Sequence, residues 1–278
     1  MNQFTFEVLF HLIGIGSASG LFYKDNSVYL ISDNGSNLYE YKIAARELSR
    51  SPLFESDITE NIPKKTKPDF EAIAEHNDTL YVFGSGSTAN RNRMVIVDRT
   101  TKSVTNVLDL TDLYTVMQSF GEITADDFNI EGVVCDGQTW YFFQRGNGGT
   151  GKNGIFSVKG DIAAGDFTIL FNGYKLPKIS GVETSFTDAT LVGNKIYFLA
   201  TAENTKSTYD DGDILGSIIG RLDLKKMKIE KTKQITDKHK LEGITLFENA
   251  DKHISFLLCE DNDTDGLQSD VFKLTLGK

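Results

Sequence analysis

Five residues recur at matching places in the chain and are of types that can bind a cation together. Counting ten residues back from the aromatic residue of each apolar run leads to Ser19, Glu71, Glu131 and Thr187, and Glu242 opens a fifth copy. Three carboxylates brought together cannot all stay charged without a counterion. With two hydroxyls they form an oxygen-only ligand set, which suits a hard cation such as Ca²⁺. The sequence therefore predicts a metal site made of these five residues.

A second interpretation of the same residues needs no ion. Each glutamate can accept hydrogen bonds from backbone N–H groups at the start of the next repeat, which would satisfy a buried carboxylate. We favour the cation, because equivalent positions of a closed repeat point to one axis.

A second set of polar residues follows the next apolar run of each copy. Arg91, Arg93 and Arg145 are of the type that binds phosphate or carboxylate through two parallel hydrogen bonds. We expect them to bind an anionic substrate together with Asn147, Glu203, Asp210 and Asp211. Glu131, Asp33 and Asp188 are the candidates for accepting a proton in catalysis. The alternative is that each of these rim residues is a solvated loop charge.

The elements that must position these residues are short strands. Each copy reads as four apolar runs separated by Asn, Asp, Gly or Thr-Lys corners, the pattern of an antiparallel meander. The copies start 52 to 60 residues apart, at residues 19, 71, 131, 187 and 242. A period near 50 that repeats strands is typical of a β-propeller. We therefore predict an all-β, five-bladed β-propeller that forms one domain over residues 1–278.

The fifth copy has only three strands before the chain stops. Residues 3–12 alternate between polar and apolar side chains, so we read them as a strand and not as a signal peptide. We expect them to complete the last blade and cover its sheet edge. Three connections are long: residues 56–69, residues 111–129, where a short helix on the axial face is expected, and residues 202–217, a candidate wall of the site.

The composition restricts the function classes. The net charge of −10 argues against a nucleic-acid or anionic-membrane surface, and no apolar run approaches the ~20 residues of a membrane-spanning helix. Cys135 and Cys259 resemble buried small hydrophobes more than a disulfide framework. We expect a monomer in the cytoplasm, with a periplasmic or secreted location if a leader has been removed. Phosphate-loop, zinc and nucleophile-elbow motifs are absent.

The chain resembles an uncharacterised family of bacterial propeller proteins over nearly its full length. The shared runs are KPDFEAIA, GSGSTANRNR, NIEGVV, QRGN, SFTDAT, TAENTKSTYDDGDILGSIIG and KLEGI.

More distantly, the order Ser, Glu, Glu, Thr, Glu is similar to the axial calcium ligands of the calcium-dependent nucleotidases, or soluble apyrases. That resemblance implies that Ser19, Glu71, Glu131, Thr187 and Glu242 hold Ca²⁺. The nucleotide-binding arm departs from the nucleotidase pattern, since its basic residues are reduced to Arg145.

Two functions are therefore expected. The first is metal-dependent hydrolysis of a phosphoester or phosphoanhydride of a small anionic molecule, with the cation polarising a phosphoryl oxygen or activating a water. The second is a non-catalytic binding or interaction propeller with a structural cation, because a propeller fold does not by itself imply an activity.

Overall fold

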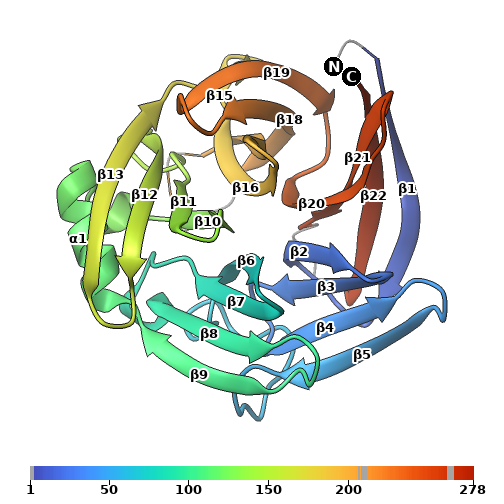
Figure 1. The fold of residues 1–278 in the computed structure, drawn as a ribbon, viewed down its shortest axis with the longest axis horizontal. Helices are drawn as coiled ribbons and strands as arrows, with labels where there is room; N and C mark the ends of the chain where they lie inside the picture. Colours follow the sequence, from blue (N-terminus) through green and yellow to red (C-terminus); the bar gives the residue numbers. More distant parts are fainter. Residues whose placement is uncertain (1–2, 206, 208–211, 262–265) are drawn as a thin grey trace.

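Five antiparallel sheets of four strands are arranged in a ring around a central axis (Figure 1). The structure is a computed structural model, and it describes residues 3–205, 207, 212–261 and 266–278. In each blade the first strand lies innermost, and the inner strands of neighbouring blades contact one another all the way around. The prediction of an all-β, five-bladed propeller is confirmed.

The strands follow the predicted repeats. Blade 1 consists of β2 (Ala18–Lys24), β3 (Ser27–Ser32), β4 (Asn37–Lys42) and β5 (Glu47–Pro52). Blade 2 consists of β6 (Phe70–His76), β7 (Thr79–Gly84), β8 (Arg93–Asp98) and β9 (Val104–Asp109). Blade 3 consists of β10 (Ile130–Cys135), β11 (Thr139–Gln144), β12 (Asn153–Asp161) and β13 (Asp166–Tyr174). Blade 4 consists of β16 (Ser185–Val192), β17 (Lys195–Asn204), β18 (Asp213–Asp223) and β19 (Lys228–Thr236). Blade 5 consists of β20 (Leu241–Asn249), β21 (His253–Glu260), β22 (Gln268–Gly277) and β1 (Phe4–Ile13).

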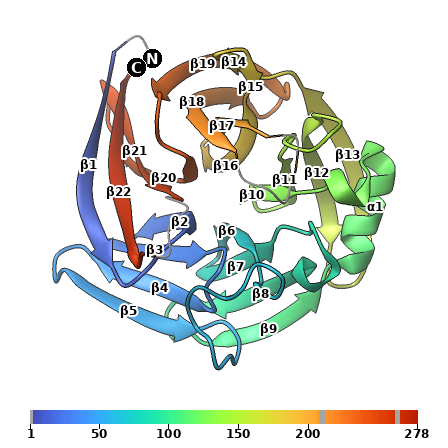
Figure 2. The same cartoon turned by 180° about the vertical axis from the view of Figure 1, so that it is seen from behind.

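The N-terminal strand closes the ring. β1 pairs antiparallel with β22 from Phe4 opposite Leu276 to Leu12 opposite Ser269. The two ends of the chain therefore lie side by side at the rim of blade 5 (Figures 1 and 2). The predicted pairing of residues 3–12 with the last strand is confirmed.

The apolar core lies between the blades and not inside them. The described residues form five buried clusters, each shared by two neighbouring sheets. A sheet buries one face against each neighbour, so the apolar residues on both faces of a blade contribute to packing. Cys259 lies in one of these clusters and both cysteines are free thiols, as predicted.

Every inner strand has a bulge at the predicted ring residue. The register of the inner pair shifts between Ala18 and Gly20, and at the same place in each of the other four blades. The residue skipped by the pairing is Ser19, Glu71, Glu131, Thr187 or Glu242. A β-bulge re-aims a side chain and bends its strand. The repeated bulge is thus the local device that turns these five side chains toward the axis.

The residue after each bulge must be small where neighbouring inner strands approach closely. A Cβ atom added to Gly132 would lie 2.9 Å from the Cα atom of Asp188 on the next blade. We expect Gly132→Ala to lower the free energy of unfolding by roughly 1–3 kcal/mol, the usual cost of overpacking. Gly173→Ala is the control, since the nearest atoms there are 3.9 Å away. Urea denaturation of both variants measures the difference, and equal stabilities would contradict the close approach.

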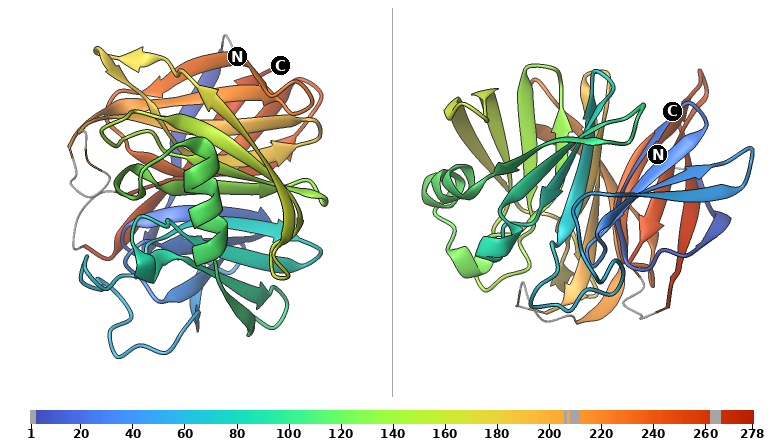
Figure 3. Two further views of the ribbon diagram at one scale, coloured as in Figure 1. Left: turned by 90° about the vertical axis from the view of Figure 1, so that its left-hand side faces the viewer. Right: turned by 90° about the horizontal axis from the view of Figure 1, so that it is seen from below.

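Two connections differ from expectation. The short helix expected within residues 111–129 is present as α1 (Thr111–Gly121), followed by the 3₁₀ turn η2 (Ala125–Asp127). It lies on the outer flank of blade 3 near β13 and not on the axial face (Figure 3), because its apolar residues Leu113, Tyr114 and Met117 pack into the cluster between blades 2 and 3. A two-residue pair, β14 (Lys178–Ile179) with β15 (Val182–Glu183), precedes blade 4 and was not predicted.

The connection predicted over residues 202–217 begins and ends in strand. β17 continues to Asn204 and β18 begins at Asp213, with Asn204 opposite Asp213. The connection over residues 56–69 is a long loop that crosses the face seen in Figure 2 before it enters β6. This loop delivers Lys67 to the axis.

Candidate axial cation site

The five predicted ring residues are buried around the axis, at the end of the inner strands where the chain enters each blade. All five side chains have less than a tenth of their surface exposed. Burial, and then the nearby carboxylates of Glu131 and Glu242 among others, raises the pKa of Glu71 well above its ordinary value. The structure therefore brings the three predicted glutamates together.

Arg145 connects glutamates from three blades. Its Nη1 donates to Glu131 Oε1 at 3.1 Å and lies 3.6 Å from Glu242 Oε1, while Nη2 donates to Glu203 Oε2 at 2.5 Å. Asn129 Nδ2 also donates to Glu131 Oε1, at 2.6 Å. Burial lowers the pKa of Arg145, but the three carboxylates outweigh burial and raise it. The buried guanidinium group of Arg145 thus links glutamates of blades 3, 4 and 5.

Lys240 provides a second internal cation on the same side. Its Nζ lies 3.3 Å from Glu242 Oε1 and 3.1 Å from Asp261 Oδ2. Burial raises the pKa of Glu242 well above its ordinary value, although Lys240 and Arg145 oppose that shift. Glu242 is therefore placed between two basic side chains.

Blades 1 and 2 contribute a separate cluster around Lys67. The Lys67 Nζ contacts Asp33 Oδ2 and lies 2.7 Å from Asp69 Oδ1. Arg91 Nη1 donates to the other oxygen of Asp69 at 2.7 Å. Burial raises the pKa of Asp69, but Lys67 and Arg91 outweigh it, so the net shift is downward. Asp69 is therefore an ionised carboxylate held by two cations.

Glu71 is the exception in this network. It is only 7% exposed, and it has no hydrogen-bond or ion-pair partner among the residues that the structure describes. Carboxylate oxygens of Glu71, Asp33 and Asp69 lie within 4.8 Å of one another. The Oδ1 atom of Asp33 is also buried without a partner among the described residues, and burial raises the pKa of Asp33 to about 6. Unsatisfied buried carboxylate oxygens are costly, so this cluster is suited to an added cation.

The full five-residue ring does not fit one ion equally well. Arg145 already bridges Glu131 and Glu242, and the hydroxyls of Ser19 and Thr187 donate to the carbonyls of Phe70 and Leu241 at 2.5 and 2.7 Å. Of the five, Glu71 is the carboxylate with no hydrogen-bond or ion-pair partner among the described residues. The five-residue ligand set that the nucleotidase resemblance implies stays a prediction.

Charge around the axis is unbalanced toward the negative. Among the described residues, seven carboxylates take part in the two clusters, and four basic side chains face them: Lys67, Arg91, Arg145 and Lys240. Buried charges are stable only when they are paired or coordinate metals. The remaining negative charge requires protons or a bound cation.

The sequence matches one family along almost its whole length. Residues 14–276 match the family described as a family of unknown function, DUF6929. The chain belongs to this family. No curated protein matches the chain.

Solved structures resemble this DUF6929 protein in fold. Glutaminyl cyclase of Myxococcus xanthus shares 8% identity at a TM-score of 0.52, covering 98% of this chain and 97% of its own. A luciferin-regenerating enzyme shares 7% at a TM-score of 0.52, covering 98% and 95%. The Pan2 WD40 domain of Neurospora crassa shares 11% at a TM-score of 0.46, covering 96% and 95%. The two structures with TM-scores of 0.52 support the propeller fold, and at identities this low they carry no activity over to this chain.

The three predicted catalytic residues of the DUF6929 protein have different surroundings. Asp188 is buried, and its Oδ2 accepts a hydrogen bond from the backbone N–H of Ile244 at 2.8 Å, so it joins blades 4 and 5. The catalytic role of Asp188 stays a prediction. Glu131 is bound through its Oε1 by Arg145 and Asn129. Asp33 has a buried Oδ1 without a partner among the described residues.

The described arginines of the predicted anion-binding rim have other partners. Arg145 and Arg91 are buried in ion pairs, and their Nε atoms are buried without a partner among the described residues. Their assignment to a substrate stays a prediction. Arg93 donates to Asn90 O and lies over the Phe54 ring.

Glu203 and Asn147 of the predicted rim also have partners within the protein. Glu203 is used by Arg145 and by the backbone N–H of Gly212. Asn147 donates weakly to Ser207 O. Asp210 and Asp211 lie outside the described residues.

Sequence reasoning missed Asp69 and Lys240, which lie two residues before ring residues Glu71 and Glu242. A signal was present: the position two residues before the ring residue is polar in every blade, as Ser17, Asp69, Asn129, Ser185 and Lys240. Their backbones hold the next turn, as in the Ser85 N–H to Asp69 O and Arg145 N–H to Asn129 O hydrogen bonds. A repeated polar position beside a repeated ligand position therefore indicates further residues of the same site.

Proposed function

We propose that the protein binds a hard divalent cation, Ca²⁺ in particular, between Asp33, Asp69 and Glu71 at the axis. The observation that carries this proposal is Glu71, a carboxylate more than nine-tenths buried with no partner among the described residues. The buried free oxygen of Asp33 gives the cluster a second unsatisfied group. Carboxylate oxygens are the ligands that Ca²⁺ prefers, and water can complete its six to eight positions.

Lys67 competes with the metal for this site. Its ammonium group contacts Asp33 and Asp69, two of the three carboxylates that would hold the ion. A metal must displace Lys67 or share these oxygens with it, which lowers affinity. The side chain comes from the long loop before β6 and not from a strand, so it can withdraw without disturbing a sheet.

Hydrolysis of a phosphoester does not form part of this proposal. The arginines that would bind a phosphate are paired with Asp69, Glu131 and Glu203, and the axis carries an excess of acid. An anionic ligand would be repelled there unless a metal bridged it. The alternative of a binding propeller with a structural cation is the one that the ion-pair geometry favours.

We expect added Ca²⁺ to raise the Tm of metal-free protein. A ligand of the folded state alone stabilises it by about 2.7 kcal/mol at a hundredfold excess over Kd. For a chain of this length that corresponds to roughly 5–10 °C. Glu71→Gln should abolish the shift, and Lys67→Met should lower the Ca²⁺ concentration needed for it. Glu47→Gln, at an exposed position of β5, is the matched control.

Two outcomes would contradict the proposal. The first is a Tm that does not respond to Ca²⁺ in protein shown to be metal-free. The second is a shift that survives Glu71→Gln but disappears in Glu131→Gln or Glu242→Gln, since that result would place the ion in the ring of five and displace Arg145.

A further inference from the structure

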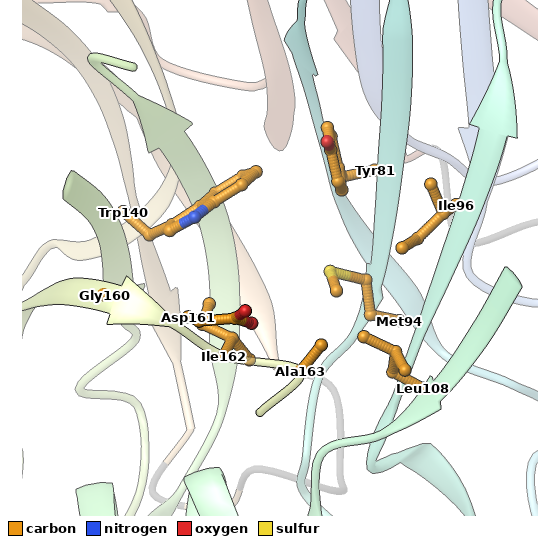
Figure 4. A pocket seen from close by; sticks show the side chains of 9 residues that line it. All are labelled: Tyr81, Met94, Ile96, Leu108, Trp140, Gly160, Asp161, Ile162 and Ala163. Atoms are coloured by element: carbon orange, nitrogen blue, oxygen red, sulfur yellow. The ribbon is translucent and has the colours of Figure 1, made fainter. Parts of the chain in front are cut away.

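A cleft of about 400 Å³ opens between blades 2 and 3, and none of the residues that line it belongs to the axial cluster (Figure 4). Blade 2 contributes Tyr81, Met94, Ile96 and Leu108 to its wall. Trp140 of blade 3 faces them, and Asp161 borders the cleft where β12 ends. This volume lies in the range of small-molecule sites, which are apolar with a few polar groups.

Two residues that line this cleft are more exposed than their equivalents in the other repeats. The repeat aromatics Tyr29, Tyr141, Tyr197 and Phe256 are at most 8% exposed, whereas their equivalent Tyr81 is only half-buried. In blades 1, 2 and 4 the residue before the aromatic is a fully buried aliphatic side chain: Val28, Leu80 or Ile196. Blade 3 has Trp140 at this position, and its side chain is partly exposed. Both departures from the repeat face the same cleft.

The cleft has a rigid aromatic wall. The rings of Trp140 and Tyr81 meet edge to face with centroids 4.8 Å apart, and Trp140 also packs on Phe83 at 5.8 Å. Phe83 is fully buried, so the indole is fixed from behind and cannot fold into the cleft to close it. Aromatic faces of this kind attract cations through the ring quadrupole.

Asp161 is the single charged side chain among the residues that line the cleft. Its Oδ1 accepts a hydrogen bond from the backbone N–H of Ala164 at 3.0 Å, which fixes the carboxylate at the turn between β12 and β13. Its Oδ2 has no partner among the described residues, and in Figure 4 the carboxylate lies beside the space between Trp140 and Met94. A carboxylate beside an aromatic and thioether wall is complementary to a positive charge on an apolar body.

We propose that this cleft binds a small organic amine, with its apolar part against Trp140, Met94 and Ile96 and its ammonium group at Asp161. The proposal does not depend on the axial cation, because the two sites share no residue.

Trp140 is the single tryptophan of the chain, so its fluorescence reports on this cleft directly. Phenethylamine, 2-phenylethanol and phenylacetate share one ring and differ in charge, and none absorbs at the red edge of tryptophan excitation. We expect phenethylamine to change Trp140 emission saturably and to bind three- to tenfold more tightly than the alcohol. Phenylacetate should bind most weakly.

Asp161→Asn should reduce the affinity for the amine to that for the alcohol and leave the alcohol unchanged. Asp166→Asn is the matched control, because Asp166 lies opposite Asp161 in the hairpin but does not line the cleft. Glu71→Gln should not alter the response, which separates this site from the axial one. No saturable change, equal binding of amine and alcohol, or an amine preference that survives Asp161→Asn would each overturn the proposal.

Discussion

Replacing Arg145 by alanine is expected to lower the free energy of unfolding by about 3–5 kcal/mol, the cost of breaking a buried ion pair by removing one partner. The substitution removes the cation between Glu131, Glu203 and Glu242, which come from three different blades. The three carboxylates are buried in the folded protein, so hydration does not replace the ion pairs that the substitution removes. Denaturant unfolding in the presence of a chelator measures the effect without interference from metal.

The pH dependence of this variant provides a second readout. Burial already raises the pKa of Glu242 well above its ordinary value, and Arg145 opposes that shift, so its removal raises the pKa further. The folded variant then retains protons that the unfolded chain releases, and its stability falls as pH rises above the unfolded value near 4.3. The difference between wild type and Arg145→Ala should therefore be smaller at about pH 5 than at about pH 8.

Arg93→Ala is the control for Arg145→Ala. Arg93 donates to a loop carbonyl and lies over an aromatic ring, and it takes no part in the axial ion pairs described above, so we expect a change within about 0.5–1 kcal/mol. If Arg145→Ala cost no more than this, the guanidinium would not hold the blades together. Its surroundings would then have to reorganise around a metal or a water cluster.

Deleting residues 1–12 is expected to prevent cooperative folding. The deletion removes almost all of β1, exposes the backbone edge of β22 and uncovers the apolar cluster that contains Leu12, which is 1% exposed. It also removes Phe6, whose ring stacks on Phe272 at 4.8 Å. An uncovered edge pairs readily with other chains. We expect a lower Tm, a broad transition and self-association, measured by circular dichroism and size-exclusion chromatography.

Single substitutions in β1 separate packing from pairing. Leu12→Ala should cost about 2–5 kcal/mol, the range for a buried leucine. Leu9→Ala should have little effect, since Leu9 is 39% exposed and lies where the register of β1 shifts. A deletion variant that unfolds at the wild-type temperature as a monomer would show that β1 is not required to close the ring.

The fold could be predicted because each blade encodes its own strands locally. Alternating apolar runs and turn residues recur in every repeat, and the ring residue sits at the same bulge in all five blades. Counting back from the repeat aromatic therefore located residues that lie 52 to 60 positions apart in the sequence but occupy equivalent places in the blades. The closing strand could be predicted for the same reason, because residues 3–12 alternate like the strand that the last blade lacks.

The candidate site could be predicted only in part. Glu71 and Asp33 were identified, but Lys67, Asp69 and Lys240 were not assigned to the axis, and Arg145 was expected to face a ligand. Each of these contacts joins side chains from separate blades or a loop. The residue types show that charges are present, but not which of them meet.

The sequence by itself determined the number of blades, their strands and the five side chains aimed at the axis, because these depend on patterns that lie within one repeat. Only the tertiary structure decided how the charges pair. Closing the ring buries several carboxylates together, and a buried carboxylate requires a counterion. Arg145 and Lys67 therefore lie at the axis and pair with these carboxylates. The same closure left Glu71 without one and left the cleft beside Trp140 open. Both features depend on the distance between blades, which no single repeat encodes.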